Sequence, residues 1–168
     1  MKSKVKDALT IKIVLTDVDG VLTDGGMYYS KEGDVMKKFF VRDGMGVTLL
    51  LKNNIPTIIV TKEQNPLIKQ WATKMKIKKL YDSVQNKELI LEKICRDYRI
   101  KPNQIAFIGD DINDIGLLKK VGLSAVPQDG INEAKKVSHY ICKNKGGHGA
   151  FREFVDLIIS KQKIKFKI

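Results

Sequence analysis

The stretch IKIVLTDVDGVLTD, residues 11–24, decides the fold because a short apolar run ends abruptly in two carboxylates. Residues 11–16 are mostly β-branched or aliphatic, which predicts a buried strand with Asp17 at its carboxyl end. Asp19 follows two residues later, and Gly20 lets the chain turn away from the strand. A polar turn would explain either aspartate alone. The pair makes this strand end a candidate site.

Outward from this stretch, predicted strands and helices alternate. Strands are expected at residues 56–60, 79–82, 105–108, 123–126 and 140–142. A β-hairpin is expected at about residues 26–41, followed by a helix with Val47, Leu50 and Leu51 on one face. Further helices are expected at residues 66–76, 87–98, 115–120, 131–137 and 150–159. This order is typical of an α/β fold, a mostly parallel Rossmann-like sheet with helices on both faces.

The length and composition limit the domain count and the cellular location. The chain has 168 residues, of which 43% are hydrophobic, which is enough for one domain over residues 1–168 with a tail from about residue 145. No apolar run approaches the ~20 residues of a membrane-spanning helix, and the charged N-terminus is unlike a signal peptide. We expect a cytoplasmic protein with no membrane partner.

The charge balance indicates an anionic partner. The chain carries 31 basic and 19 acidic residues, a formal net charge of +12. The lysines are spread along the whole chain, without interleaved aromatic residues or a nucleic-acid motif. We therefore expect a small phosphorylated or carboxylated metabolite as the partner, and no nucleic acid.

Polar residues follow three of the predicted strands. Asp17, Thr61 and Asp110 each come directly or almost directly after a buried strand. Carboxyl ends of parallel strands meet at one edge of the sheet, so these residues are expected to lie close together. Asp110 begins a second acidic cluster with Asp111, Asn113 and Asp114, and clustered carboxylates are costly unless a cation or hydrogen bonds offset their charges. Oxygen ligands of this kind fit Mg²⁺.

A phosphate next to these carboxylates would also need donors and positive charge. Thr61 offers a hydroxyl and a backbone N–H, and Lys87, at the start of a predicted helix, offers an ammonium group. A helix N-cap and a solvated lysine are the structural alternatives for these two residues.

The motifs DVDGVLTD, PTIIVT, Lys87 and GDDIND resemble, in order, the four motifs of the haloacid dehalogenase superfamily. The resemblance implies a phosphatase in which Asp17 is the nucleophile and Asp19 the general acid and base. It implies that Asp17, the carbonyl of Asp19 and Asp110 hold Mg²⁺. Asp111, Asn113 and Asp114 would orient the metal shell, and Thr61 and Lys87 would bind the phosphoryl group.

The short spacing between motifs leaves no room for a large cap domain. Together with residues 42–46 (RDGMG) and 146–153 (GGHGAFRE), it resembles the capless phosphatases of 3-deoxy-ulosonate phosphates. That resemblance implies a homotetramer whose hairpins form a central barrel and whose glycine-rich tail reaches a neighbouring active site. It also implies Arg42 and Arg152 as substrate-binding residues.

Two branches of that group differ in substrate. The octulosonate (KDO) 8-phosphate branch usually has Thr-Gly-Arg where this chain has Thr61-Lys62-Glu63. Glu63 and Lys74 resemble the substrate-binding glutamate and lysine of the nonulosonate (sialic acid type) 9-phosphate branch, which we expect here. Arg42-Asp43-Gly44 favours KDO 8-phosphate, the alternative substrate. A non-catalytic oligomerisation module is a third possibility, which the intact motifs oppose.

Overall fold

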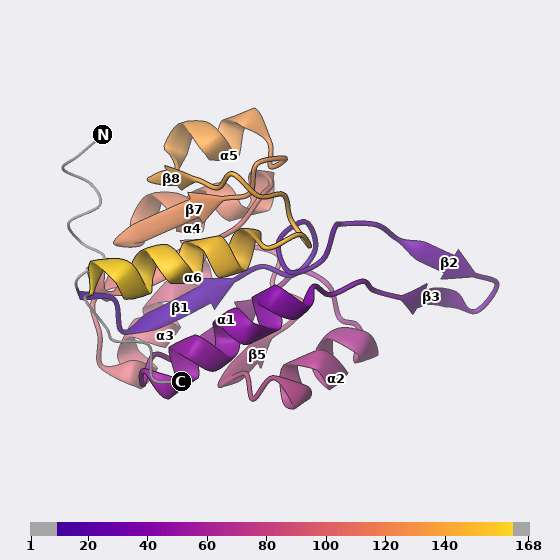
Figure 1. Ribbon diagram of the computed structural model, residues 1–168, viewed down its shortest axis with the longest axis horizontal. Coiled ribbons are helices and arrows are strands. Elements are labelled where there is room, and N and C mark those ends of the chain that lie inside the picture. The colour runs from indigo at the N-terminus through magenta and orange to yellow at the C-terminus, as the bar shows by residue number, and fades with distance from the viewer. Residues whose placement is uncertain (1–9, 163–168) are drawn as a thin grey trace.

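The computed structural model describes residues 10–162 (Figure 1). The predicted end of the C-terminal tail, residues 163–168, lies outside the described residues. Within residues 10–162, no helix is long and apolar enough to cross a membrane.

Strand β1 (Ile13–Thr16) lies inside a six-stranded parallel sheet, as the sequence predicted. The strand order is β5-β4-β1-β6-β7-β8, and each neighbouring pair runs parallel. Strands β1, β4, β6 and β7 are buried along their whole length because helices cover both faces. The other strands are β4 (Thr57–Val60), β5 (Lys79–Tyr81), β6 (Ile105–Ile108), β7 (Leu123–Val126) and β8 (Tyr140–Ile141).

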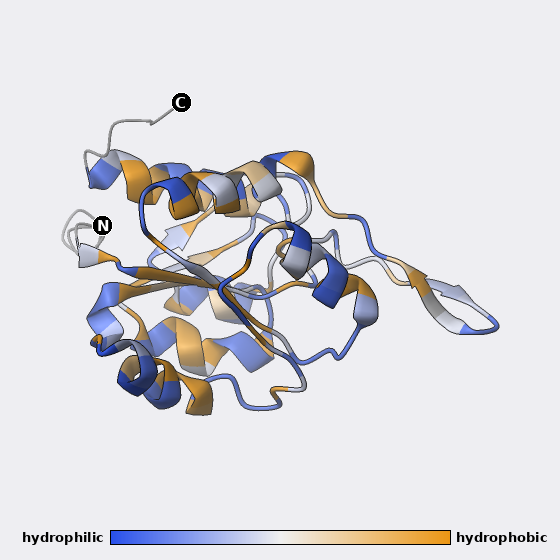
Figure 2. Ribbon diagram, turned by 90° about the horizontal axis from the view of Figure 1, so that it is seen from below, coloured by the Kyte–Doolittle hydropathy of each residue, from blue (hydrophilic) through white to orange (hydrophobic). Residues whose placement is uncertain are grey.

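Successive side chains of each strand point to opposite faces of the sheet, and this alternation builds two hydrophobic cores. Val14 belongs to one core and Leu15 to the other. The Val14 core is covered by α1 (Val41–Lys52), α2 (Pro66–Lys74) and α6 (Ala150–Lys161). The Leu15 core is covered by α3 (Leu89–Tyr98), α4 (Ile115–Lys120) and α5 (Asn132–Val137), so the sheet lies between two helical layers (Figure 2).

The buried face of α1 differs from the predicted one. Val47 and Leu50 are buried, but Leu51 is 44% exposed. Helix α1 packs closely on α6 at Gly46, where an added Cβ would lie 3.3 Å from the Phe151 ring. Because α1 contacts α6 at Gly46, the side of α1 that carries Gly46 and Leu50 is buried, and Leu51 lies on the exposed side. Of the three residues predicted to share one face of this helix, Leu51 is therefore the one that lies outside the core.

A buried carboxylate joins α1 to α6. Asp43 accepts hydrogen bonds from the backbone N–H groups of Arg152 (2.8 Å) and Gly149 (3.3 Å), at the start of α6. Burial raises the pKa of Asp43 to about 6, although these hydrogen bonds oppose the rise. Asp43 thus satisfies orphan donors at the N-terminus of α6 from a distant part of the chain.

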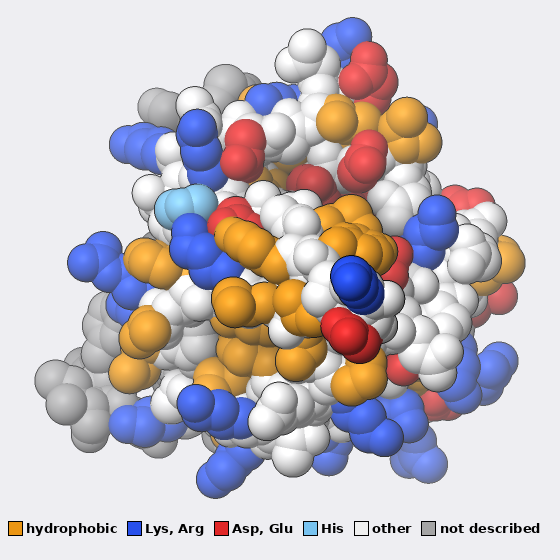
Figure 3. All heavy atoms as spheres, turned by 90° about the vertical axis from the view of Figure 1, so that its right-hand side faces the viewer, with side chains coloured by type: hydrophobic (Ala, Val, Ile, Leu, Met, Phe, Trp, Pro, Cys, Tyr) orange, Lys and Arg blue, Asp and Glu red, His pale blue; other side chains and the backbone are white. Residues whose placement is uncertain are grey.

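The predicted hairpin consists of β2 (Tyr28–Ser30) and β3 (Gly33–Met36), which pair antiparallel and project from the body of the molecule (Figure 1). A bridge between Thr23 and Phe39 closes the base of the hairpin. Hydrophobic side chains gather on the face from which it projects (Figure 3). The exposed ones in this region are Met27, Tyr28, Tyr29, Val35, Met36, Val41 and Met45.

Candidate active site

The carboxyl ends of β1, β4 and β6 meet at one edge of the sheet, where Asp17, Thr61 and Asp110 line a common pocket of about 330 Å³. This is the convergence that the parallel alternation predicted. Residues of the hairpin segment also line the pocket. The remaining lining residues are Asp19, Gly25, Met27, Tyr29, Lys37, Lys62, Glu63, Gln64, Asn65, Asp111 and Asn113.

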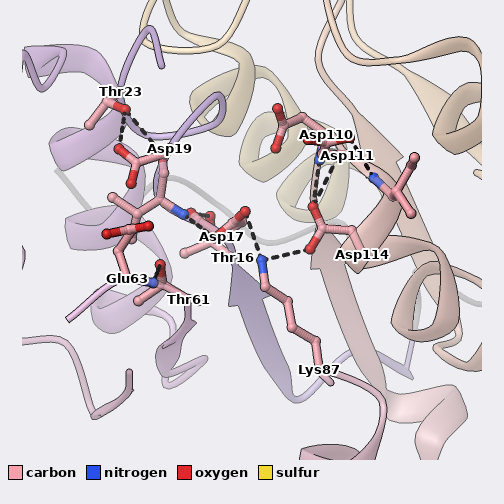
Figure 4. Close-up of polar contacts among 12 residues, drawn as sticks. Thr16, Asp17, Asp19, Thr23, Thr61, Glu63, Lys87, Asp110, Asp111 and Asp114 are labelled. Carbon is pink, nitrogen blue, oxygen red and sulfur yellow. Dashed lines mark hydrogen bonds and ion pairs between the residues drawn. The ribbon is translucent and has the colours of Figure 1, made fainter. Parts of the chain in front are cut away.

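Asp17 is held by one partner at each carboxylate oxygen. Its Oδ1 accepts the backbone N–H of Val18 at 2.7 Å, and its Oδ2 lies 2.7 Å from Nζ of Lys87 (Figure 4). The residue is only 7% exposed. Burial raises the pKa of Asp17 above its ordinary value, and the positive charge of Lys87 opposes that rise. The carboxylate is therefore fixed in orientation and poorly hydrated, as an activated nucleophile requires.

Lys87 lies just before α3 and is completely buried, so it is not the solvated lysine of the structural alternative. Its Nζ bridges Asp17 and Asp114 at 2.7 Å each. Burial alone would lower the pKa of Lys87, but the charges of Asp17 and Asp114 outweigh it and raise the pKa. Lys87 thus remains a buried cation beside the nucleophile.

Asp114 organises the acidic loop after β6. Its Oδ2 accepts the backbone N–H groups of Asp110 (2.8 Å) and Asp111 (3.2 Å), while its Oδ1 binds Lys87. The side chain has no exposed surface. These contacts hold the loop of Asp110 against Asp17, a positioning task that agrees with the orienting role expected for Asp114.

Three carboxylates form a group that fits a divalent cation. One oxygen each of Asp17, Asp110 and Asp114 lies within 4.8 Å of the others. Burial raises the pKa of Asp110 to about 8, and the negative charges of Asp17 and Asp114 add to that rise. Lys87 supplies one positive charge against three carboxylates, so a hard cation with oxygen ligands would relieve the repulsion. The donor set fits Mg²⁺, as predicted.

Asp19 also lines the pocket, and its two oxygens differ. Oδ1 accepts hydrogen bonds from Nζ of Lys37 (2.8 Å) and the hydroxyl of Thr23 (3.0 Å). Oδ2 is buried and has no hydrogen-bond partner among the described residues. A buried carboxyl oxygen without a hydrogen-bond partner is costly, so Oδ2 lacks a hydrogen-bond donor or a cation in this arrangement.

Thr61 reaches the pocket with its hydroxyl only. Its backbone N–H donates to the carbonyl of Tyr81 at 2.9 Å, because the ladder between β4 and β5 continues past Val60. The expectation that this N–H is available to a phosphate was wrong. The hydroxyl accepts the N–H of Glu63 at 3.2 Å and keeps its own proton for a ligand. The N-cap of α2 is Asn65, so the capping alternative for Thr61 is also wrong.

The remaining predicted residues fall into two sets. Glu63, Asp111 and Asn113 line the pocket with Asp17. Lys74, at the end of α2, instead lines a groove with Phe39 and the Trp71 ring that stacks on it. Arg42 and Arg152 line another cavity, with Asn144, His148, Gly149, Glu153 and Asp156.

Within one protomer, the structure therefore does not bring Lys74, Arg42 or Arg152 to the pocket of Asp17. The glycine-rich segment, too, lies against its own chain: the N–H of Gly147 donates to the carbonyl of Val21 at 2.9 Å. The groove of Lys74 adjoins the pocket, because Lys37 lines both. A substrate-binding role of Lys74, Arg42 and Arg152 stays a prediction.

Sequence reasoning missed Lys37. It stands in the unremarkable run Met36-Lys37-Lys38, and no local pattern separates it from the other lysines. One signal was available: a hairpin that starts after Asp24 must return to its starting point, so the residues after its second strand end beside the loop of Asp19.

Comparisons with known proteins agree with this geometry. Residues 52–154 match the family model described as haloacid dehalogenase-like hydrolase. The chain is 34% identical over 158 residues to the 3-deoxy-D-manno-octulosonate 8-phosphate phosphatase KdsC of Yersinia pestis, covering 94% of this chain and 84% of that protein. Against the Haemophilus influenzae enzyme of the same name, identity is 33%, over 90% of this chain and 84% of that protein.

Solved structures show the same fold. The Moraxella catarrhalis 3-deoxy-D-manno-octulosonate 8-phosphate phosphatase, in complex with magnesium, phosphate and KDO, superimposes with a TM-score of 0.93 at 31% identity. That match covers 97% of this chain and 94% of the other. The cobalt-bound Haemophilus influenzae phosphatase gives a TM-score of 0.91 at 32% identity, over 94% and 92% of the two chains. The chain therefore belongs to the haloacid dehalogenase-like hydrolases, and it is a phosphatase of the type that includes KdsC.

Proposed function

We propose that this phosphatase hydrolyses the phosphate ester of a 3-deoxy-ulosonate phosphate, with 3-deoxy-D-manno-octulosonate 8-phosphate as its substrate. The observation that carries the proposal is the pocket that Asp17, Asp19 and Asp110 line together. The substrate is supported by relatives that match this chain over nearly its whole length and are named for it. This choice replaces our expectation of a nonulosonate 9-phosphate, which relied on Glu63 and Lys74: Glu63 lines the pocket, but Lys74 does not, and the relatives are named for KDO 8-phosphate.

In the proposed reaction, a carboxylate oxygen of Asp17 attacks phosphorus as the bond between phosphorus and the sugar oxygen breaks. Asp19 donates its proton to the departing oxygen, which leaves as the sugar alcohol. Asp19 then takes a proton from water, and the water oxygen attacks the aspartyl-phosphate, which releases inorganic phosphate and restores Asp17. The position of Asp19 in the same pocket as Asp17 supports this role.

The carboxylates of Asp17 and Asp110, with the backbone carbonyl of Asp19, would hold Mg²⁺. When bound there, Mg²⁺ supplies positive charge that offsets the charge of the phosphoryl oxygens. Asp111, Asn113 and Asp114 would orient its surroundings; of these, Asp114 already binds the backbone of Asp110.

Lys87 and Thr61 would bind the phosphoryl group. The ammonium of Lys87 has three protons, of which Asp17 and Asp114 take two. The Thr61 hydroxyl, which lines the pocket, and the third proton of Lys87, which is buried next to Asp17, would go to phosphoryl oxygens. This arrangement suits a transition state stabilised mainly by electrostatics.

One observation favours a second substrate. Glu63 lines the pocket beside Thr61, where the octulosonate branch usually has arginine. A carboxylate at this position can accept hydrogen bonds from a hydroxyl or amide of a nine-carbon sugar acid. A nonulosonate 9-phosphate is therefore the second candidate.

We also propose that the chain forms a homotetramer through its hairpin. The hairpin exposes Met27 (64%), Tyr29 (65%) and Met36 (57%), and such a gathering of apolar surface marks an interaction site. Light scattering on wild-type protein and on the Met36→Glu variant tests this proposal. We expect a tetramer for the wild type and smaller species for the variant; a monomeric wild type would contradict the proposal.

The substrate is tested by phosphate release in the presence of Mg²⁺. The panel contains KDO 8-phosphate, N-acetylneuraminate 9-phosphate, KDN 9-phosphate and hexose phosphates, with Asp17→Asn as the inactive control. We expect the highest kcat/KM for KDO 8-phosphate. A preference for the nine-carbon substrates that Glu63→Ala abolishes would establish the second candidate, and turnover by Asp17→Asn at the wild-type rate would refute the mechanism.

A further inference from the structure

Lys37 is an unusual lysine because its side chain is almost completely buried. It follows β3 at the base of the hairpin, and only 4% of its side chain is exposed, against 48% for the neighbouring Lys38. Its Nζ lies 2.8 Å from Oδ1 of Asp19 and it lines the pocket of Asp17. A buried lysine loses side-chain entropy and hydration, so its ion pair must hold a defined geometry to offset that loss.

The contact distinguishes the two oxygens of Asp19. Oδ1 accepts from both Lys37 and the Thr23 hydroxyl, whereas Oδ2 is buried without a partner among the described residues (Figure 4 shows the Thr23 contact). Oδ1 is therefore the oxygen through which Lys37 and Thr23 hold the carboxylate in place.

We propose that Lys37 is a positioning residue for the general acid. By holding Oδ1, it fixes the rotamer of Asp19 in the pocket that it lines with Asp17. This inference rests on the proposed function, in which Asp19 protonates the departing oxygen. The geometry of proton transfer is strict, since the acid must lie within hydrogen-bond reach of the atom that it protonates.

The position of Lys37 depends on the hairpin. The two strands leave the loop of Asp19 and return to it, and the bridge between Thr23 and Phe39 closes the base two residues after Lys37. Besides exposing apolar surface, the hairpin therefore places Lys37, which contacts the proposed general acid, in the active site.

The test compares two substrates that differ in their need for a proton. An alcohol leaving from KDO 8-phosphate needs protonation, whereas 4-nitrophenolate leaves from 4-nitrophenyl phosphate without it. For Lys37→Met we expect kcat/KM for KDO 8-phosphate to fall about 100-fold, the low end of a general acid's contribution. We expect kcat/KM for 4-nitrophenyl phosphate to stay near the wild-type value, which also shows that the variant folds.

Lys37→Arg, which keeps the charge, should restore most of the lost activity on KDO 8-phosphate. Lys38→Met is the matched control: the neighbouring lysine contacts Asp24 at 3.3 Å and does not contact Asp19, so both substrates should react as in the wild type. Thr23→Val, which removes the second donor to Oδ1, should show the same substrate difference with a smaller loss.

Equal losses on both substrates in Lys37→Met would overturn the proposal, because a general structural effect does not distinguish leaving groups. A rise in KM for KDO 8-phosphate with unchanged kcat would overturn it too, since Lys37 would then bind the sugar acid.

The Asp19→Asn variant separates failure of the positioning role of Lys37 from failure of the proposed function. If that variant shows the substrate difference and Lys37→Met does not, only the positioning role fails; if wild-type protein hydrolyses neither compound, the proposed function fails.

Discussion

Lys87 shows how a single buried charge can hold a site together. It has no exposed surface and lies 2.7 Å from both Asp17 and Asp114. A buried ion pair is weak evidence for stability by itself, but removal of one partner leaves the other as an uncompensated buried charge.

We expect Lys87→Met to lower the free energy of unfolding by about 3 kcal/mol or more, because Asp17 and Asp114 then lose their shared cation. Urea unfolding at neutral pH measures the change. Lys120→Met is the control: Lys120 is 55% exposed and pairs with Glu88 at 3.3 Å, so its loss should cost less than about 1 kcal/mol. Equal stability of Lys87→Met and wild type would contradict the buried geometry.

Glu153 gives a pH-dependent contribution. Its carboxylate accepts hydrogen bonds from the Tyr140 hydroxyl (2.6 Å), the Lys143 N–H (2.9 Å) and both Asn144 donors (3.0 and 2.8 Å). Burial raises its pKa, but these bonds outweigh burial and lower the pKa below its ordinary value of 4.5. The stabilisation is therefore present above pH 4.5 and is lost as the pH falls through the lowered pKa.

We expect Glu153→Gln to cost about 1.5 to 3 kcal/mol at pH 7, the usual value of hydrogen bonds to a charged group. As the pH falls from 4.5 through the lowered pKa, the wild-type Glu153 itself takes up a proton, so the difference between the two proteins should shrink. Urea unfolding at a series of pH values checks this. A difference that stays constant down to the acid limit would show that Glu153 acts without its charge.

Between elements, the glycine-rich segment after β8 supports the loop that carries Asp17 and Asp19. The N–H of Gly147 donates to the carbonyl of Val21 at 2.9 Å, and the N–H of Gly146 donates to Asp129 at 2.9 Å. A Cβ at position 146 would overlap the carbonyl oxygen of Gly20. Glycine is needed at position 146 because two backbones meet there, not because the chain turns.

Gly146→Ala should therefore displace the loop of Asp17 and lower kcat/KM by about 10-fold or more, since small misplacements of reacting groups are costly. Steady-state kinetics with 4-nitrophenyl phosphate measures the effect. The control is Gly44→Ala in α1, where the added Cβ would meet only the flexible Met75 side chain, at 2.9 Å. Similar activity of Gly146→Ala and Gly44→Ala would show that the loop does not depend on this contact.

For the whole molecule, metal binding and folding are linked because residues from separate elements form the acidic group. Asp17 follows β1 and Asp110 follows β6, so the group exists only in the folded chain. A ligand that binds only the native state stabilises it according to its concentration relative to Kd.

We expect MgCl₂ at about 100 times its Kd to stabilise the protein by about 2.7 kcal/mol and to raise its Tm, as differential scanning calorimetry would record. Asp110→Asn should abolish the rise. Asp97→Asn, which alters an exposed carboxylate paired with Lys93 on α3, should keep it. An equal rise in Tm with MgCl₂ in Asp110→Asn would show that Mg²⁺ binds somewhere other than this group of carboxylates.

The amino-acid sequence alone was sufficient for the sheet, its helices and the residues at its strand ends. Short buried runs such as Ile105–Ile108 encode strands through local burial, and parallel pairing then forces Asp17, Thr61 and Asp110 to one edge. These features depend on residues close in sequence and on a general rule of topology, so they are readable without a structure.

Only the tertiary structure decided which side chains meet across long stretches of chain. It paired Lys37 with Asp19, committed the N–H of Thr61 to Tyr81, and placed Lys74 in a neighbouring groove rather than in the pocket itself. Sequence spacing does not specify these contacts, because each depends on how a hairpin, a sheet ladder or a helix is placed against distant elements. The residues at the strand ends were therefore predictable from the local sequence pattern. The contact of Lys37 with Asp19 was decided by the packing of the whole fold.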